Sequence, residues 1–72
     1  MSTMVDARGL SCPQPVLDTL QQLKIQQKGE LIVMVDTDAS KENVIRAARS
    51  RKWQTKDVQP EGSGYRITFT KE

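Results

Sequence analysis

The chain contains no histidine and only one cysteine among its 72 residues. A single cysteine cannot form a disulfide within the chain, and without histidine it cannot join a Cys–His dyad of the protease type. A redox cycle that closes an internal disulfide is excluded as well, because there is no second thiol. Structural zinc sites use about four Cys or His ligands. We therefore expect neither a bound metal nor a cofactor, and any cysteine chemistry must involve another molecule.

The sequence also lacks a long apolar run, a secretory segment and a large net charge. The first two absences predict a cytoplasmic protein that makes no membrane contact. The net charge of +2 is too small to indicate a nucleic-acid partner, and aromatic residues make up only 4% of the chain. With so few rings to stack on bases, we do not expect direct nucleic-acid binding. The charge is uneven, since residues 1–40 sum to −2 and residues 41–72 to +4.

The length predicts one small domain that spans residues 1–72. A core of this size is too thin to enclose a substrate, so chemistry is expected at the surface. A small domain with no disulfide and no metal must rest on its hydrophobic core, with support from a partner where needed.

Hydrophobic periodicity predicts four strands and two helices. Residues 31–35 (LIVMV) form a continuous apolar run that is typical of a buried central strand. Apolar and polar side chains alternate over 65–69, which indicates a half-buried strand after the turn sequence PEGSG at 60–64. The two other predicted strands are 4–7 and 55–59.

Apolar residues at helical spacing predict a first helix over 15–27, with Val16, Leu17, Leu20 and Leu23 on its buried face. Gly29 is expected to stop this helix. A second helix is predicted over 41–52, with Ser40 as its cap and Trp53 as an anchor against the core.

The resulting order is β-α-β-α-β-β. Two right-handed parallel crossovers place both helices on one face of one sheet, and the final hairpin must supply an antiparallel strand. We therefore predict an α/β fold: a two-layer sandwich with a mixed four-stranded sheet, each helix covering it with its apolar face.

The segment LSCPQP places the only thiol, Cys12, at the start of the first helix. If Cys12 caps the helix, Pro13 and Pro15 occupy positions whose amides would have no intrahelical acceptor. The amides that remain, beginning with that of Gln14, then point toward the sulfur. Because residues that precede proline avoid the α region, the helix alternatively begins at Pro15. Either way a nearby helix N-terminus favours the thiolate, and such positions lower a thiol pKa from about 8.5 to as little as about 3.5–7.5.

A lone cytosolic cysteine is often a small buried hydrophobe. Here its neighbours are typical of a turn, and the apolar face of the helix begins only at Val16. We therefore interpret Cys12 as a nucleophile, with Pro13, Gln14 and Pro15 shaping its site. Arg8, four residues earlier, would either add positive potential at the thiolate or face solvent.

The motif Cys12-Pro13-x-Pro15, preceded by DARGL at 6–10 and set in this element order, resembles the TusA/SirA family of small sulfur-transfer proteins. The resemblance covers essentially the whole chain. It implies a fold like the C-terminal domain of bacterial translation initiation factor three, with strand order 1-2-4-3. It also implies that Cys12 accepts sulfane sulfur as a persulfide and hands it on. The implied donors are cysteine desulfurases or rhodanese-like proteins, and the implied destinations are tRNA thiolation, cofactor assembly and sulfur or selenium metabolism.

Two other functions remain open from the residues alone. In one, the chain is a protein-interaction or regulatory module whose CPxP turn only caps a helix. In the other, a basic cluster late in the second helix docks an acidic partner or RNA phosphate. Arg46 and Arg49, three residues apart on one helix face, are the best docking candidates in that cluster, although cations near a helix C-terminus also suit a solvated face.

Overall fold

The computed structural model describes residues 2–10 and 14–72. The chain runs β1 (Ser2–Asp6), α1 (Gln14–Gln26), β2 (Gly29–Val35), α2 (Asp38–Ser50), β3 (Gln54–Glu61) and β4 (Gly64–Lys71). The strand order is β1-β2-β4-β3. β1 pairs with β2 in parallel, and β4 is antiparallel to both of its neighbours. The predicted order of elements, mixed sheet and strand order are therefore confirmed.

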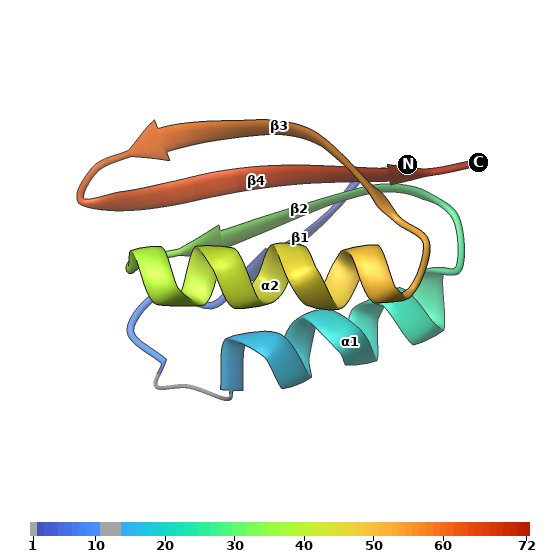
Figure 1. Cartoon of the computed structure of the whole chain (residues 1–72), viewed down its shortest axis with the longest axis horizontal. Helices are drawn as coiled ribbons and strands as arrows, with labels where there is room; N and C mark the ends of the chain where they lie inside the picture. The colour runs from blue at the N-terminus through green and yellow to red at the C-terminus, as the bar shows by residue number, and fades with distance from the viewer. Residues whose placement is uncertain (1, 11–13) are drawn as a thin grey trace.

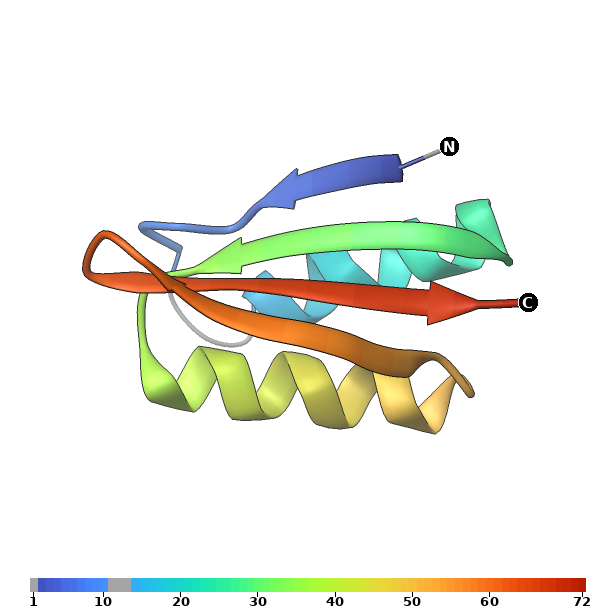
Figure 2. The same ribbon diagram turned by 90° about the horizontal axis from the view of Figure 1, so that it is seen from above.

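Both helices cover the same face of the sheet, as Figures 1 and 2 show. α1 and α2 run side by side with their N-terminal ends at the same end of the molecule, where β1 and β2 end and where β3 turns into β4. The core between the layers is formed by alternating residues of the two central strands together with one stripe of each helix. Its largest members are Leu23, Leu31, Phe69, Ile67 and Trp53, each at most 3% exposed. The anchoring role predicted for Trp53 is confirmed.

The buried stripe of α1 differs from the prediction. Pro15, Thr19 and Leu23 are its buried residues, whereas Leu17 is 51% exposed. The face that contacts the sheet follows the spacing of four set by these three residues, and Leu17 falls outside it. The polar Thr19 is accommodated because its hydroxyl donates a hydrogen bond to the carbonyl of Pro15 at 2.8 Å.

The predicted cap of α2 is wrong. Thr37 has extended backbone angles, and its Oγ1 accepts a hydrogen bond from the amide of Ser40 at 3.0 Å. The helix therefore begins three residues earlier, and Ser40 is a buried residue of its first turn. It also ends earlier than predicted, at Ser50, and the positive φ of Lys52 (67°) turns the chain toward β3.

The last hairpin is tighter than the turn sequence suggests. Glu61 pairs with Gly64, and Pro60 lies inside β3 opposite Tyr65. β3 is an edge strand, where a proline can turn its missing N–H away from the ladder. Every residue of this strand is exposed.

Candidate functional site

Cys12, the predicted nucleophile, and Pro13 lie outside the described residues. The structure does describe the two segments that flank them. On one side is the loop that follows β1, up to Leu10. On the other is α1, whose first residue, Gln14, comes two positions after Cys12. The structure confirms that a helix begins close after Cys12 in the sequence, at Gln14. The position of the thiol relative to that helix start stays a prediction.

The beginning of α1 is fixed by burial and by local hydrogen bonds. Pro15 is almost completely buried, and its carbonyl accepts the bond from Thr19 described above. Gln14 is exposed, and its Nε2 donates to a carboxylate oxygen of Asp18 at 2.7 Å. The first turn of α1 contains no acidic residue, so no carboxylate there cancels the positive end of the helix dipole.

The loop before Cys12 is held to the end of β2. Ala7 is fully buried and donates its amide to the carbonyl of Met34 at 2.8 Å. Gly9 has a φ of 77°, a conformation that suits glycine, and its amide donates to Asp36 at 2.7 Å. These two hydrogen bonds, from Ala7 and Gly9, therefore tie the loop to the C-terminal end of β2.

Arg8 forms a two-pronged ion pair with Asp6. Its Nε and its terminal nitrogen each donate to one carboxylate oxygen at 2.9 Å, and its backbone amide donates at 3.2 Å. These hydrogen bonds hold the pKa of Asp6 at about 2, below its usual 3.8, and raise the pKa of Arg8. Both side chains are about half exposed. The charge of Arg8 is therefore shared with Asp6, and a role for it at Cys12 stays a prediction.

The start of α2 lies at the same end of the molecule (Figure 1). The hydroxyl of Tyr65 donates a short hydrogen bond to Asp38, which raises the pKa of Tyr65. The ammonium of Lys41 lies 4.5 Å from the centre of the Tyr65 ring. These contacts join the first turn of α2 to the beginning of β4.

Arg46 and Arg49, the predicted docking residues, are exposed on α2. Neither forms an ion pair within the described part of the chain. Arg46 follows Asp38 by eight residues, or about 12 Å of helix. The structure therefore places these arginines along the helix face and away from the end where α1 begins.

Sequence reasoning missed two positions that shape this site. Asp36 follows β2 in a stretch typical of a turn, and it is the acceptor for the amide of Gly9. Thr19 drew no attention because a threonine inside a helix carries no distinctive pattern. Its only signal is its spacing of four from Pro15, which allows a hydroxyl to reach that carbonyl.

The family model for sulfurtransferase TusA matches residues 3–71. The chain belongs to the TusA family. A solved SirA-like protein from Desulfitobacterium hafniense superposes with a TM-score of 0.83 at 26% identity, covering 94% of this chain and 95% of that one. The search of curated proteins found no match.

Membership of the TusA family supports a general role in carrying sulfur together with sulfur-transfer partners. Within the described residues, no helix is long and apolar enough to cross a membrane. No cluster of three potential metal ligands occurs in that part of the chain either.

Proposed function

We propose that this chain is a sulfurtransferase of the persulfide-relay type, with Cys12 as the residue that carries the sulfur. The observation that carries the proposal is that the only thiol of a TusA-family chain precedes the first residue of α1 by two positions. The donor is a cysteine desulfurase or a rhodanese-like protein, and the acceptor is a second protein. We assign the relay to the cytoplasm, where a single thiol remains reduced.

In the loading step, the thiolate of Cys12 attacks the terminal sulfur of a donor persulfide. The new S–S bond forms as the donor S–S bond breaks, and the donor cysteine leaves as a thiolate. In the delivery step, a thiolate of the acceptor attacks the same terminal sulfur and regenerates the Cys12 thiolate. Because the chain has no second cysteine, no internal thiol can discharge the persulfide as a disulfide.

The described residues support this chemistry in two ways. The N-terminus of α1 carries about half a positive charge, which favours a thiolate over a thiol. The buried Pro15 and the bonds at Ala7 and Gly9 fix the chain on both sides of the thiol. We propose that Pro13, Gln14, Pro15 and Arg8 shape the site around Cys12 without reacting themselves.

The test is intact mass after exposure to a persulfide-loaded desulfurase, combined with the alkylation rate of the thiol against pH. We expect the wild type to gain about 32 Da, the mass of one added sulfur, and to show a thiol pKa below about 7.5. Cys12→Ser should gain nothing while keeping the same circular dichroism spectrum. A wild-type chain with a thiol pKa near 8.5 and no added mass would contradict the proposal and leave an interaction module whose CPxP turn only caps α1.

A further inference from the structure

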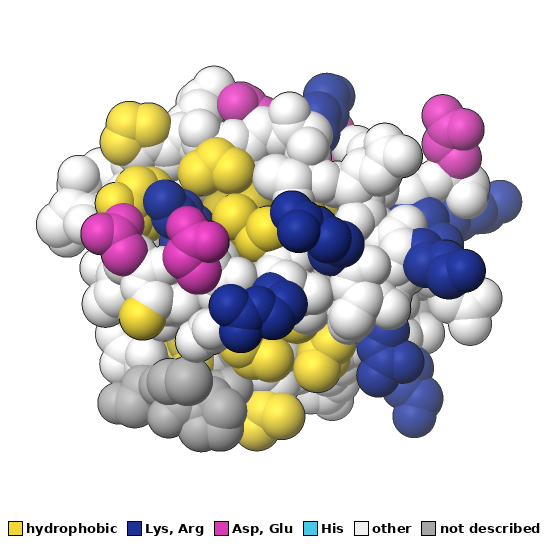
Figure 3. Space-filling model, in the orientation of Figure 1, with side chains coloured by type: hydrophobic (Ala, Val, Ile, Leu, Met, Phe, Trp, Pro, Cys, Tyr) yellow, Lys and Arg dark blue, Asp and Glu magenta, His cyan; other side chains and the backbone are white. Residues whose placement is uncertain are grey.

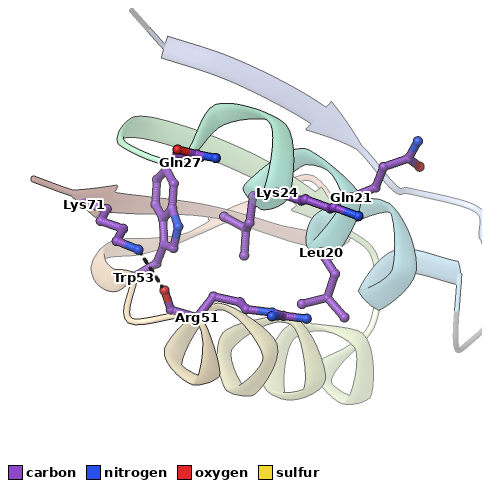
Figure 4. Close-up of a pocket in the computed structure, with 8 residues that line it drawn as sticks. Leu20, Gln21, Lys24, Gln27, Arg51, Trp53 and Lys71 are labelled. Atoms are coloured by element: carbon purple, nitrogen blue, oxygen red, sulfur yellow. Dashed lines mark hydrogen bonds between the residues drawn. The ribbon is translucent and has the colours of Figure 1, made fainter.

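A groove opens on the helix layer, between α1 and the C-terminal end of α2, and extends to the end of β4 (Figure 4). Its volume is about 700 Å³. Lys24 lies ten residues after Gln14, or about 15 Å along α1. The groove is therefore separate from the helix start that carries the proposed sulfur chemistry. Three apolar residues lie at its floor: Leu20 is partly exposed, whereas Leu23 and Trp53 are each only 3% exposed. Its rim is formed by the cations Lys24, Arg51 and Lys71.

The cations of the rim have no acidic partner. None of the three forms an ion pair within the described residues, and no described carboxylate lines the groove. Lys71 donates to the backbone carbonyl of Arg51 at 3.3 Å, and the Arg51 side chain lies along the groove toward Leu20 (Figure 4). By contrast, Lys56 and Arg66, which lie outside the groove, are each paired with a glutamate at 3.3 Å.

The positive charge continues beyond the rim. Figure 3 shows Lys and Arg side chains gathered over the middle and right of this view, with acidic side chains at its left, at its top and at its upper right edge. Lys28, Arg49 and Lys52 are exposed near the C-terminal ends of the two helices and have no ion pair among the described residues. A partner that covers the groove therefore meets a basic surface that extends well past a small ligand.

We infer that this groove docks an acidic, amphipathic segment of a partner protein, with its apolar side against Leu20 and its carboxylates on the three cations of the rim. Charge complementarity carries the inference, because the rim offers three cations and no carboxylate. Docking here leaves the start of α1 uncovered.

RNA fits the same surface less well. A phosphate backbone would use the cations but would leave the partly exposed Leu20 uncovered. The described aromatic residue that lines the groove, Trp53, is too buried to stack on a base. A small anion would contact only the cations of the rim, and it would not reach the basic side chains that lie beyond the groove.

The experiment measures binding by fluorescence anisotropy on the full chain carrying Cys12→Ser, so that the outcome does not depend on sulfur transfer. The probe is a labelled peptide of about ten residues that alternates Glu with Leu. A peptide with Gln in place of Glu and a single-stranded RNA of similar length are compared. The groove variant carries Lys24→Gln, Arg51→Gln and Lys71→Gln. A matched control carries Lys41→Gln, Lys56→Gln and Arg66→Gln. It loses the same number of positive charges, but at positions outside the groove.

We expect the acidic peptide to bind wild-type chain at low salt and to bind the groove variant about tenfold more weakly. The control variant should lose less than about threefold, because only long-range charge is removed. Amide shift changes in NMR should map to Leu20, Lys24 and Lys71. Absence of peptide binding, equal loss in the two variants, or tighter binding of the RNA than of the peptide would each overturn the inference. Circular dichroism of both variants checks that they are folded.

Discussion

The close approach of β4 to the end of β2 provides a sharp test of packing near the proposed site. A Cβ atom built on Gly64 would lie 2.2 Å from the carbonyl oxygen of Val35 and 2.7 Å from the Cα of Asp36. Ordinary Cβ contacts begin at 3.4 Å, so Gly64→Ala requires the main chain to shift by more than 1 Å. β2 is paired on both sides, with β1 and with β4, and cannot move without weakening a ladder.

Overpacking of this kind costs about 1–3 kcal/mol. Because the clashing atoms belong to main chain, we expect Gly64→Ala to lower the free energy of unfolding by about 3 kcal/mol. A chain of this length has about 4–11 kcal/mol in total. Each kcal/mol lowers Tm by about 4–8 °C in a domain of this size, so Tm should fall by about 12–24 °C. Asp36 also holds the amide of Gly9, so the same shift should loosen the loop before Cys12.

The matched control is Gly62→Ala in the same hairpin. Gly62 has a φ of 60° with no atom within 4 Å of its built Cβ, so alanine there costs only the left-handed backbone, about 1 kcal/mol. Urea denaturation followed by circular dichroism and by the fluorescence of Trp53, the only tryptophan, measures both variants. If Gly64→Ala were no less stable than Gly62→Ala, the close approach would not be a constraint and the reasoning would be wrong.

Three further outcomes follow from single contacts. The pKa of Asp6, about 2 beside Arg8, means that the stabilisation from this pair is present above about pH 4 and lost as the pH falls through 2. The difference between the urea midpoints of wild type and Asp6→Asn should therefore shrink as the pH falls from about 4 through 2. The raised pKa of Tyr65 should appear in an absorbance titration of this single tyrosine, and Asp38→Asn should move the midpoint back toward 10; an unchanged midpoint would show that the bond is absent. Thr19→Val removes a buried hydroxyl and keeps the side-chain shape, so we expect a loss of about 1 kcal/mol in urea denaturation, whereas equal stability would mean that the hydroxyl bond contributes nothing.

The fold was accessible from the sequence because its strongest patterns are local. The apolar run at 31–35 and the alternation at 65–69 belong to the two central strands, where alternate residues such as Leu31, Val33 and Phe69 face the helix layer and are buried. Chain order and the handedness of crossovers then leave few topologies. The insertion of β4 between β2 and β3 came only from the family resemblance, since hairpin signals do not say which other strand β4 joins.

Element boundaries were less accessible where several residues offer the same chemistry. The stretch DTDAS at 36–40 contains four residues that can cap a helix, and only the extended backbone of Thr37 decides between them. Leu17 illustrates a second limit. A helix wheel defines an apolar face, but the sheet contacts only part of it, and the position of that contact depends on tertiary packing.

The groove could not be predicted, because Lys24, Arg51 and Lys71 are far apart in the chain and meet only through the layer arrangement. The sequence showed the basic cluster late in the second helix but gave no sign that a lysine at the end of the last strand completes it.

The carboxylates at the end of the molecule where α1 begins affect the pKa expected for the Cys12 thiol. Four aspartates at 6, 18, 36 and 38 would oppose a thiolate at the start of α1 if their charges were bare, because like charges raise a thiol pKa. In the structure each accepts at least one hydrogen bond, and one is also paired with a guanidinium. The donors are Arg8 to Asp6, Gln14 to Asp18, Gly9 to Asp36 and Tyr65 to Asp38. A nearby cation balances two of these charges, since Asp6 pairs with Arg8 and Asp38 lies 3.9 Å from the ammonium of Lys41. The first turn of α1 contains no carboxylate. The helix dipole is therefore the field that we expect to set the pKa of Cys12, which makes the thiol titration a test of the helix start rather than of the surrounding acids.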